Sequence, residues 1–215
     1  MIFHDRTYAA FLLEEYLRPY RETDTILLAI PRGGVPIGFQ LAKLLHLPLG
    51  IIQCKKIGHP SNPEYAIGAV SEDEVLLEKE GKEASEEFLA QEASRIQQSF
   101  KEKKKLFGLT DDPLDLRNKT VIVIDDGIAT GKTLKACIAQ IRRKFPKKII
   151  IAVPVSSRQA KALLTPLVDD FICLHTPFDL QAISLYYEHF PQVGDEEVRK
   201  LLAETKIFSR NKTIA

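Results

Sequence analysis

Two adjacent carboxylates and a run of small residues share one fourteen-residue stretch, residues 120–133 (TVIVIDDGIATGKT). Asp125 and Asp126 can each accept hydrogen bonds from neighbouring hydroxyls of a sugar, or support a magnesium ion shared with a diphosphate. The residues after them carry backbone amides that can surround a phosphate where the next helix begins. These residues are Gly127, Ile128, Ala129, Thr130, Gly131, Lys132 and Thr133. The combination predicts a site for a phosphorylated sugar.

The last four residues of this stretch, TGKT, also end the P-loop motif of nucleotide-binding proteins. That motif requires a glycine five positions before Gly131, where this chain has Asp126. The two carboxylates would also repel a polyphosphate that lay over them. A P-loop kinase is therefore disfavoured.

A second glycine loop follows another candidate strand. Residues 25–30 (TILLAI) are apolar and lead directly into Pro31, Arg32, Gly33 and Gly34, after which a helical pattern resumes. Arg32 on its own would most simply be a solvated turn residue. A second strand, loop and helix unit in one sheet favours an anion-binding loop instead.

A basic pair, Lys55 and Lys56, follows a short candidate strand at residues 49–53. Prolines in the next segment predict a mobile or extended loop over residues 57–69, with residues 66–70 returning to a strand. A basic pair at a strand end is often only solvated. Its place before this loop favours contact with a diphosphate.

Strands and helices must alternate to position these loops. The apolar runs at residues 120–124 and 148–155 predict buried strands, separated by an amphipathic helix. The same alternation along the chain predicts an α/β fold, a mostly parallel twisted sheet with helices on both faces. We expect one domain over residues 1–215, with segments 1–20 and 177–215 forming a small hood or appendage.

Four further helices are expected around this sheet. The first spans about residues 5–17, with its apolar face formed by Tyr8, Phe11, Leu12 and Tyr16. A polar helix is expected within residues 79–107, and Ser156 is expected to cap a helix that ends near residue 164. A short helix should start near Asp195.

Composition limits the classes of partner. The chain has 30 basic and 29 acidic side chains, so it has no general attraction to nucleic acid or to a membrane, and we expect neither as a partner. No apolar run approaches membrane-spanning length, and the acids near the N-terminus do not fit a signal peptide. Cys54, Cys137 and Cys173 lie in apolar segments, as reduced core residues do. We therefore expect a cytoplasmic protein.

The segment VIVIDDGIATGKT resembles the phosphoribosyl pyrophosphate signature of the type I phosphoribosyltransferases, because an apolar strand, an acid pair and T-G-x-T follow in that order. Residues 31–34 (PRGG) look like the pyrophosphate loop of that family. Residues 55–70 (KKIGHPSNPEYAIGAV) occupy the place of its flexible loop. Together with DRTYAAFLL and YYEHFPQVGDEEVRKLL, these segments make nearly the whole chain similar to bacterial predicted phosphoribosyltransferases of undefined acceptor.

This resemblance implies a magnesium-dependent transfer of a 5-phosphoribosyl group from phosphoribosyl pyrophosphate to a nitrogen acceptor, a nucleobase or similar molecule, in nucleotide metabolism. Asp125 and Asp126 would hold the ribose hydroxyls and contact magnesium indirectly, because the donor itself would supply most of the metal's ligands. Residues 129–133 would wrap the 5-phosphate. The departing pyrophosphate would meet Arg32, Gly33, Gly34, Lys55 and Lys56. The residues implied in catalysis are Asp125, Asp126, Arg32 and Lys56.

The acceptor stays open at this stage. Enzymes of the hypoxanthine type carry an Asp where this chain has Ala129, so the resemblance argues against a 6-oxopurine acceptor. The alternative function is a non-catalytic module on the same fold that senses phosphoribosyl pyrophosphate or a nucleotide. The oligomeric state is also open, with a homodimer as one option.

Overall fold

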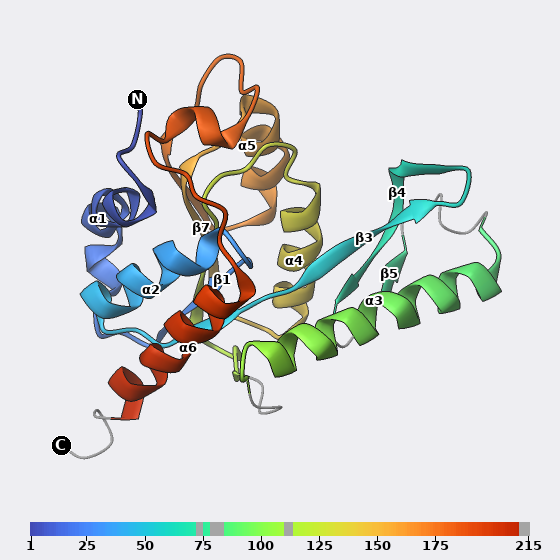
Figure 1. The fold of residues 1–215 in the computed structure, drawn as a ribbon, viewed down its shortest axis with the longest axis horizontal. Coiled ribbons are helices and arrows are strands. Elements are labelled where there is room, and N and C mark those ends of the chain that lie inside the picture. The colour runs from blue at the N-terminus through green and yellow to red at the C-terminus, as the bar shows by residue number, and fades with distance from the viewer. Residues whose placement is uncertain (72–74, 78–83, 110–113, 211–215) are drawn as a thin grey trace.

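The computed structural model describes residues 1–71, 75–77, 84–109 and 114–210. Figure 1 shows a main body built around one sheet and a smaller part, formed by a hairpin and a long helix, that extends to one side. The predicted strand at residues 148–155 and the predicted helix start at Asp195 are both confirmed.

A five-stranded parallel sheet forms the centre of the main body. Its strand order is β2 (Leu49–Ile51), β1 (Thr25–Ala29), β6 (Thr120–Ile124), β7 (Lys148–Val155) and β8 (Asp170–His175). All five residues of β1 are buried, as are four of the five in β6, because helices cover both faces of the sheet. The predicted α/β class with a parallel sheet is confirmed.

Each face of the sheet packs its own layer of helices. On one face, α1 (Arg6–Leu17) and α2 (Gly34–Leu45) enclose a core that includes Leu27 and Ile122. On the other face, α4 (Lys132–Arg143) and α5 (Arg158–Leu164) pack over Val121, Val123 and Ile151. Alternate residues of one strand thus serve opposite cores, which is why the four buried residues of β6 are all apolar.

Helix α1 forms where the sequence predicts it, but the face assigned to it was wrong. Tyr8, Phe11 and Tyr16 are exposed, whereas the buried residues are Arg6, Ala9, Ala10, Leu13 and Leu17. Both sets recur at helical spacing, so periodicity alone could not choose between them. The smaller alanines let α1 lie close to its neighbours.

The segment predicted as a mobile or extended loop at residues 57–69 is a β-hairpin instead, and the return to a strand predicted at residues 66–70 is confirmed. Strand β3 (Cys54–His59) pairs antiparallel with β4 (Asn62–Ser71), and β5 (Val75–Leu77) adds a third strand. Pro60 lies in the turn, where the missing amide hydrogen costs no ladder bond. Long-range packing overrides the loop signal, because the hairpin buries apolar residues against a helix.

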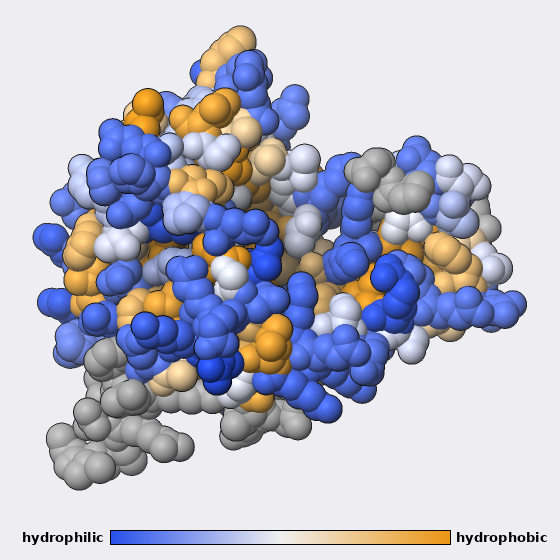
Figure 2. Space-filling view, viewed as in Figure 1, coloured by the Kyte–Doolittle hydropathy of each residue, from blue (hydrophilic) through white to orange (hydrophobic). Residues whose placement is uncertain are grey.

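That helix is α3 (Glu86–Leu106), capped by the Ser85 hydroxyl, which accepts a hydrogen bond from the Phe88 amide at 3.2 Å. It begins later than the predicted helix, whose residues 79–83 lie outside the described residues. A separate apolar cluster joins α3 to the hairpin, consisting of Ile57, Ile67, Val70, Ala84, Leu89, Ala93, Ile96 and Phe100. In Figure 2 the surface is hollowed between the main body and the hairpin.

In the part of the chain that the structure describes, the remaining elements are three short turns and one helix. They are the short 3-10 turns at Arg18–Tyr20, Thr165–Leu167 and Ile183–Tyr186, and helix α6 (Asp195–Arg210), which packs against α2. Helix α5 is capped by Ser157, whose hydroxyl accepts from the Ala160 amide at 2.9 Å, and not by Ser156 as predicted. Among the described residues, no helix combines the length and the apolar character that crossing a membrane would require.

The two terminal segments of the chain lie together. The Phe3 amide donates to the Tyr186 carbonyl at 2.8 Å, and the Glu188 amide donates to the Phe3 carbonyl at 2.9 Å. Phe3 and Tyr187 also pack ring against ring, with centroids 5.4 Å apart. The start of the chain and the segment before α6 therefore form one layer beside the sheet.

Candidate functional site

The two predicted loops meet at the carboxyl edge of the sheet. Strand β1 connects through α2 to β2 on one side, whereas the neighbouring β6 connects through α4 to β7 on the other side. The connections diverge between β1 and β6, and ligands of open α/β sheets bind in the crevice at such a switch point. Residues 31–34 follow β1 and Asp125 follows β6, so both loops lie at this crevice.

The glycines of the first loop allow a very close approach to the second. A Cβ atom on Gly33 would lie 2.0 Å from Asp126 Oδ2, and one on Gly34 would lie 2.5 Å from the Ile124 carbonyl oxygen. Neither position could hold a larger residue without displacing these atoms. The peptide bond between Pro31 and Arg32 is cis. The structure thus places the predicted pyrophosphate loop directly against the predicted acid pair.

The second loop turns into the N-terminus of α4. Gly131 takes a left-handed conformation at φ 72° and caps α4, and Ala129, Thr130, Lys132 and Thr133 around it are exposed. Exposed amides at a helix N-terminus suit a phosphate. The Ser157 hydroxyl fixes the loop by donating to the Ala129 carbonyl at 2.6 Å.

Two other residues of this loop have an anchoring position. The Ile128 side chain is buried, and its amide donates to the Val155 carbonyl at 2.9 Å. Ile128 therefore holds the loop on β7, and its amide is already committed to a protein hydrogen bond. A Cβ atom on Gly127 would lie 2.6 Å from Ile183, so the terminal segment packs directly on the loop.

The acid pair is crowded by protein atoms, although both residues retain some exposed surface. Asp125 Oδ1 accepts a hydrogen bond from the Asp126 amide at 2.9 Å. Burial and then the charge of Asp126 raise the pKa of Asp125 well above its ordinary value. Burial also raises the pKa of Asp126, against the opposing effect of Arg6.

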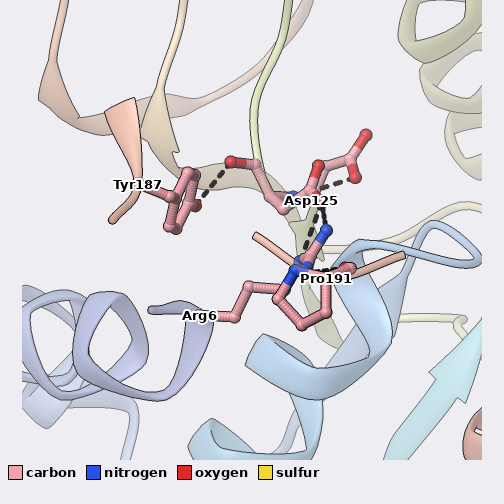
Figure 3. Close-up of polar contacts among 5 residues, drawn as sticks. Arg6, Asp125, Tyr187 and Pro191 are labelled. Atoms are coloured by element: carbon pink, nitrogen blue, oxygen red, sulfur yellow. Dashed lines mark hydrogen bonds and ion pairs between the residues drawn. The ribbon is translucent and has the colours of Figure 1, made fainter. Parts of the chain in front are cut away.

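Arg6 and Tyr187 both donate hydrogen bonds to Asp126. Figure 3 labels these two donors and marks the contacts with dashed lines. Arg6 donates from Nε and Nη2 to Asp126 Oδ2 at 3.0 and 2.8 Å, and its Nη1 donates to the Pro191 carbonyl at 2.8 Å. The Tyr187 hydroxyl donates to the Asp126 carbonyl oxygen at 2.7 Å. Burial raises the pKa of Tyr187, which keeps it a neutral donor.

Sequence reasoning missed both residues. Nothing in the sequence around Tyr187 marks a polar contact with a loop 61 residues away in sequence. Arg6 had a signal, because residues 6, 10, 13 and 17 share one helical face and the last three are apolar. A charge that interrupts the buried stripe of a helix needs a buried partner.

Arg32 has an acidic neighbour from the C-terminal helix. Its Nη1 lies 3.6 Å from Asp195 Oδ1, and both side chains are more than one-third exposed. The pair is loose by the standard of a charge-assisted hydrogen bond. Arg32 can therefore turn towards another anion.

The two lysines lie on opposite faces of β3. Lys55 shares its face with Ile57, which packs under α3, and Glu92 of α3 has its pKa lowered by a hydrogen bond from Arg95 and also by the charge of Lys55. Lys56 shares its face with Cys54, whose thiol donates to the Gln140 side chain of α4 at 3.3 Å. Lys56 is thus on the α4 side of the hairpin and Lys55 is not.

The carboxylate oxygens fit a magnesium ion that takes most of its ligands from elsewhere. Among the described residues, no three His, Cys, Asp or Glu side chains are grouped to hold a metal. Asp125 and Asp126 each have one oxygen committed to a protein hydrogen bond. Mg²⁺ prefers six oxygens and commonly takes one or two carboxylates plus phosphates and water.

Comparisons with known proteins agree with this geometry. The family profile of the phosphoribosyl transferase domain matches residues 6–183. Two Mycobacterium tuberculosis proteins that carry the provisional name phosphoribosyl transferase, Rv0571c and MT0597, are 32% identical over 201 residues. The match covers 92% of this chain and 45% of each relative, so the chain spans less than half of their length.

Solved structures show the same fold. The crystal structure of TT1426 from Thermus thermophilus is 32% identical, with a TM-score of 0.86 over 95% of this chain and 99% of that chain. The AQ2163 protein from Aquifex aeolicus is 12% identical, with a TM-score of 0.51 over 92% of this chain and 83% of that one, a likeness of fold alone.

Proposed function

Because this chain belongs to the family of phosphoribosyl transferase domains, we propose that it transfers a 5-phosphoribosyl group from phosphoribosyl pyrophosphate to a nitrogen acceptor and releases pyrophosphate. The observation that carries this proposal is the contact between the two loops at the switch point. Gly33 lies against the Asp126 carboxylate, so groups suited to a diphosphate and groups suited to a ribose line one crevice.

The donor would lie across both loops. Asp125 and Asp126 would accept hydrogen bonds from the ribose hydroxyls through their uncommitted oxygens. The backbone amides of residues 129–133, all of which except Gly131 are exposed residues, would hold the 5-phosphate at the N-terminus of α4. Arg32 would leave Asp195 for the diphosphate, whose greater negative charge attracts the guanidinium more strongly.

The charge that develops during transfer determines what the protein must do. As the bond between carbon one of the ribose and the diphosphate lengthens, the ribose becomes positive and the leaving group becomes more negative. Arg32, and Lys56 from the α4 side of the hairpin, would stabilise the leaving group, while the acid pair fixes the sugar. Magnesium, when bound with the donor, would neutralise part of the diphosphate charge.

The hairpin β3–β4 would exclude water from the reaction. It spans residues 54–71, which include Lys56, and the surface between it and the main body is hollowed (Figure 2). Water competes with the acceptor for the activated sugar, so a cover over the hollow favours transfer over hydrolysis.

The acceptor would enter from the layer made by the two terminal segments. Those segments contact the acid pair through Arg6 and Tyr187 and pack on Gly127 through Ile183. Ala129 carries no group that could bond a base, which is the reason for disfavouring a 6-oxopurine. A nucleobase or a similar nitrogen heterocycle is our proposal for the class. A cytoplasmic location and a homodimer stay predictions.

A metabolite extract can identify the acceptor. The protein is incubated with magnesium, phosphoribosyl pyrophosphate and the extract, and mass spectrometry is used to find products that gain the mass of a phosphoribosyl group. We expect a donor-dependent product that is absent with Asp126→Asn. Donor binding without any such product across the extract would support a sensor module instead.

A further inference from the structure

We infer that Arg6 is a positioning residue of the donor site, which orients the Asp126 carboxylate so that its Oδ1 atom is presented to the ribose hydroxyls. This inference rests on the proposed function, since it concerns the same donor site. It assigns a role to a residue of the first helix, far in sequence from both loops.

The contacts of Asp126 leave one oxygen available. Arg6 directs both Nε and Nη2 to the same oxygen, Oδ2, at 3.0 and 2.8 Å. A Cβ atom on Gly33 would lie 2.0 Å from Oδ2 and 2.8 Å from Oδ1, so the first loop lies against the whole carboxylate and closest to Oδ2. Among the described residues, none donates a hydrogen bond to Asp126 Oδ1.

Arg6 is itself held in place. The Phe190 ring lies 3.8 Å from the guanidinium carbon, and the Pro191 carbonyl accepts from Nη1 at 2.8 Å. The Arg6 and Asp126 side chains are 9% and 15% exposed, so water competes little with their pairing. Phe190 and Pro191 thus hold the Arg6 guanidinium in the orientation in which it contacts the Asp126 carboxylate.

Stability alone does not explain this pair. A buried ion pair loses much of its attraction to the cost of removing both charges from water, and apolar residues of similar size often serve a fold as well. What the pair adds is a fixed orientation and a negative charge beside the sugar. Tyr187 restrains the backbone of the same residue through the Asp126 carbonyl, in agreement with a need for orientation.

Two substitutions separate positioning from folding. Arg6→Lys keeps the charge but cannot reproduce the two parallel donors of a guanidinium. Arg6→Ala removes both and leaves space that a free guanidinium ion can enter. Calorimetry with phosphoribosyl pyrophosphate and magnesium measures donor affinity directly, and thermal unfolding monitors the fold. Arg18→Ala is the matched control, because Arg18 is an exposed arginine at the end of α1 that pairs with Glu14.

We expect Arg6→Lys to fold and to bind the donor about 10- to 100-fold more weakly, the range for losing a hydrogen bond to a charged group. Guanidinium ions at millimolar concentration should restore donor binding to Arg6→Ala, whereas urea, which has a similar shape and no charge, should not. Arg18→Ala should bind as the wild type does.

The two failures are distinguishable. If the wild type binds no phosphoribosyl pyrophosphate, the proposed function fails. If the wild type binds the donor and folded Arg6→Lys binds it equally well, the positioning role is overturned. Equal restoration by urea and guanidinium would also overturn it, because filling the space would then be sufficient. If Arg6→Ala does not fold, the donor affinity of Arg6→Lys by itself tests the positioning role.

Discussion

At the scale of single residues, the structure distinguishes two neighbouring lysines that the sequence treats alike. Lys56→Ala should slow transfer by about tenfold or more, because a cation facing the leaving group is lost. Lys55→Ala should change the rate little, since Lys55 lies on the α3 side of the strand near Glu92. Initial rates of pyrophosphate release for both variants provide the comparison. Equal losses, or a loss confined to acceptor affinity, would refute the assignment to Lys56.

Asp126→Asn tests the acid pair. Asparagine keeps the size of the side chain but removes the negative charge, so donor turnover should fall steeply even at saturating donor. Circular dichroism should still show a native fold, because the amide oxygen can accept from Arg6. An unchanged rate would remove Asp126 from the mechanism.

The other carboxylate makes the ligand-free protein sensitive to pH. Burial and the charge of Asp126 raise the pKa of Asp125 well above its ordinary 3.8. The folded state therefore binds more protons than the unfolded state above that pH, and the free energy of unfolding falls as pH rises through the raised pKa. Asp125→Asn removes this effect, and its amide oxygen can still accept from the Asp126 amide.

Asp125→Asn should accordingly raise the melting temperature, and by more at about pH 8 than at about pH 5, where more of the wild-type carboxyl is protonated. Thermal unfolding of both proteins without donor provides the measurement. A melting difference that is constant over this range would show that Asp125 carries no pH-dependent cost.

At the scale of elements, the close contact between two loops gives the next prediction. Gly33→Ala should weaken donor binding about tenfold or more, because the new Cβ would lie 2.0 Å from Asp126 Oδ2 and must displace the carboxylate. Gly194→Ala is the control, since a Cβ there meets no atom within 4 Å. Calorimetry with the donor compares the two, and equal binding by both would mean that the carboxylate moves freely.

The two loops and the strands before them could be predicted because the residues that form each one are consecutive in the sequence. β6, Asp125, Asp126 and the turn at Gly131 are consecutive in sequence, and a strand buried on both faces is apolar at every position. Residues 31–34 follow the same pattern after β1. The structure adds their mutual contact, which no local pattern contains.

Other elements depended on distant partners and were mistaken for that reason. The exposed and buried faces of α1 have the same period, and only the packing of α2 and the sheet selects Ala10 and Leu13. The hairpin β3–β4 was predicted as a loop except at residues 66–70, because its apolar residues are buried by α3, which follows later in the chain. Arg6 and Tyr187 reach Asp126 across 120 and 61 residues.

At the scale of the whole molecule, the two ends of the chain complete a site whose chemical groups come from its middle. Arg6 from the first helix pairs with Asp126, and Asp195 at the start of the last helix lies beside Arg32. The first pair is buried and close, while the second is longer and more exposed. The fold therefore firmly holds the carboxylate that we propose binds the ribose, and leaves the arginine that we propose binds the diphosphate able to move.

The balance between pyrophosphate and product tests the central proposal most directly. Phosphoribosyl pyrophosphate labelled with carbon-13 at carbon one of the ribose is supplied with magnesium and an acceptor found in the metabolite extract. Labelled product and released pyrophosphate are then quantified together. Phosphoribosyl transfer predicts one labelled product for each pyrophosphate released, and loss of both with Asp126→Asn. Donor binding that yields no labelled product, or pyrophosphate that is matched only by labelled ribose 5-phosphate, would contradict it.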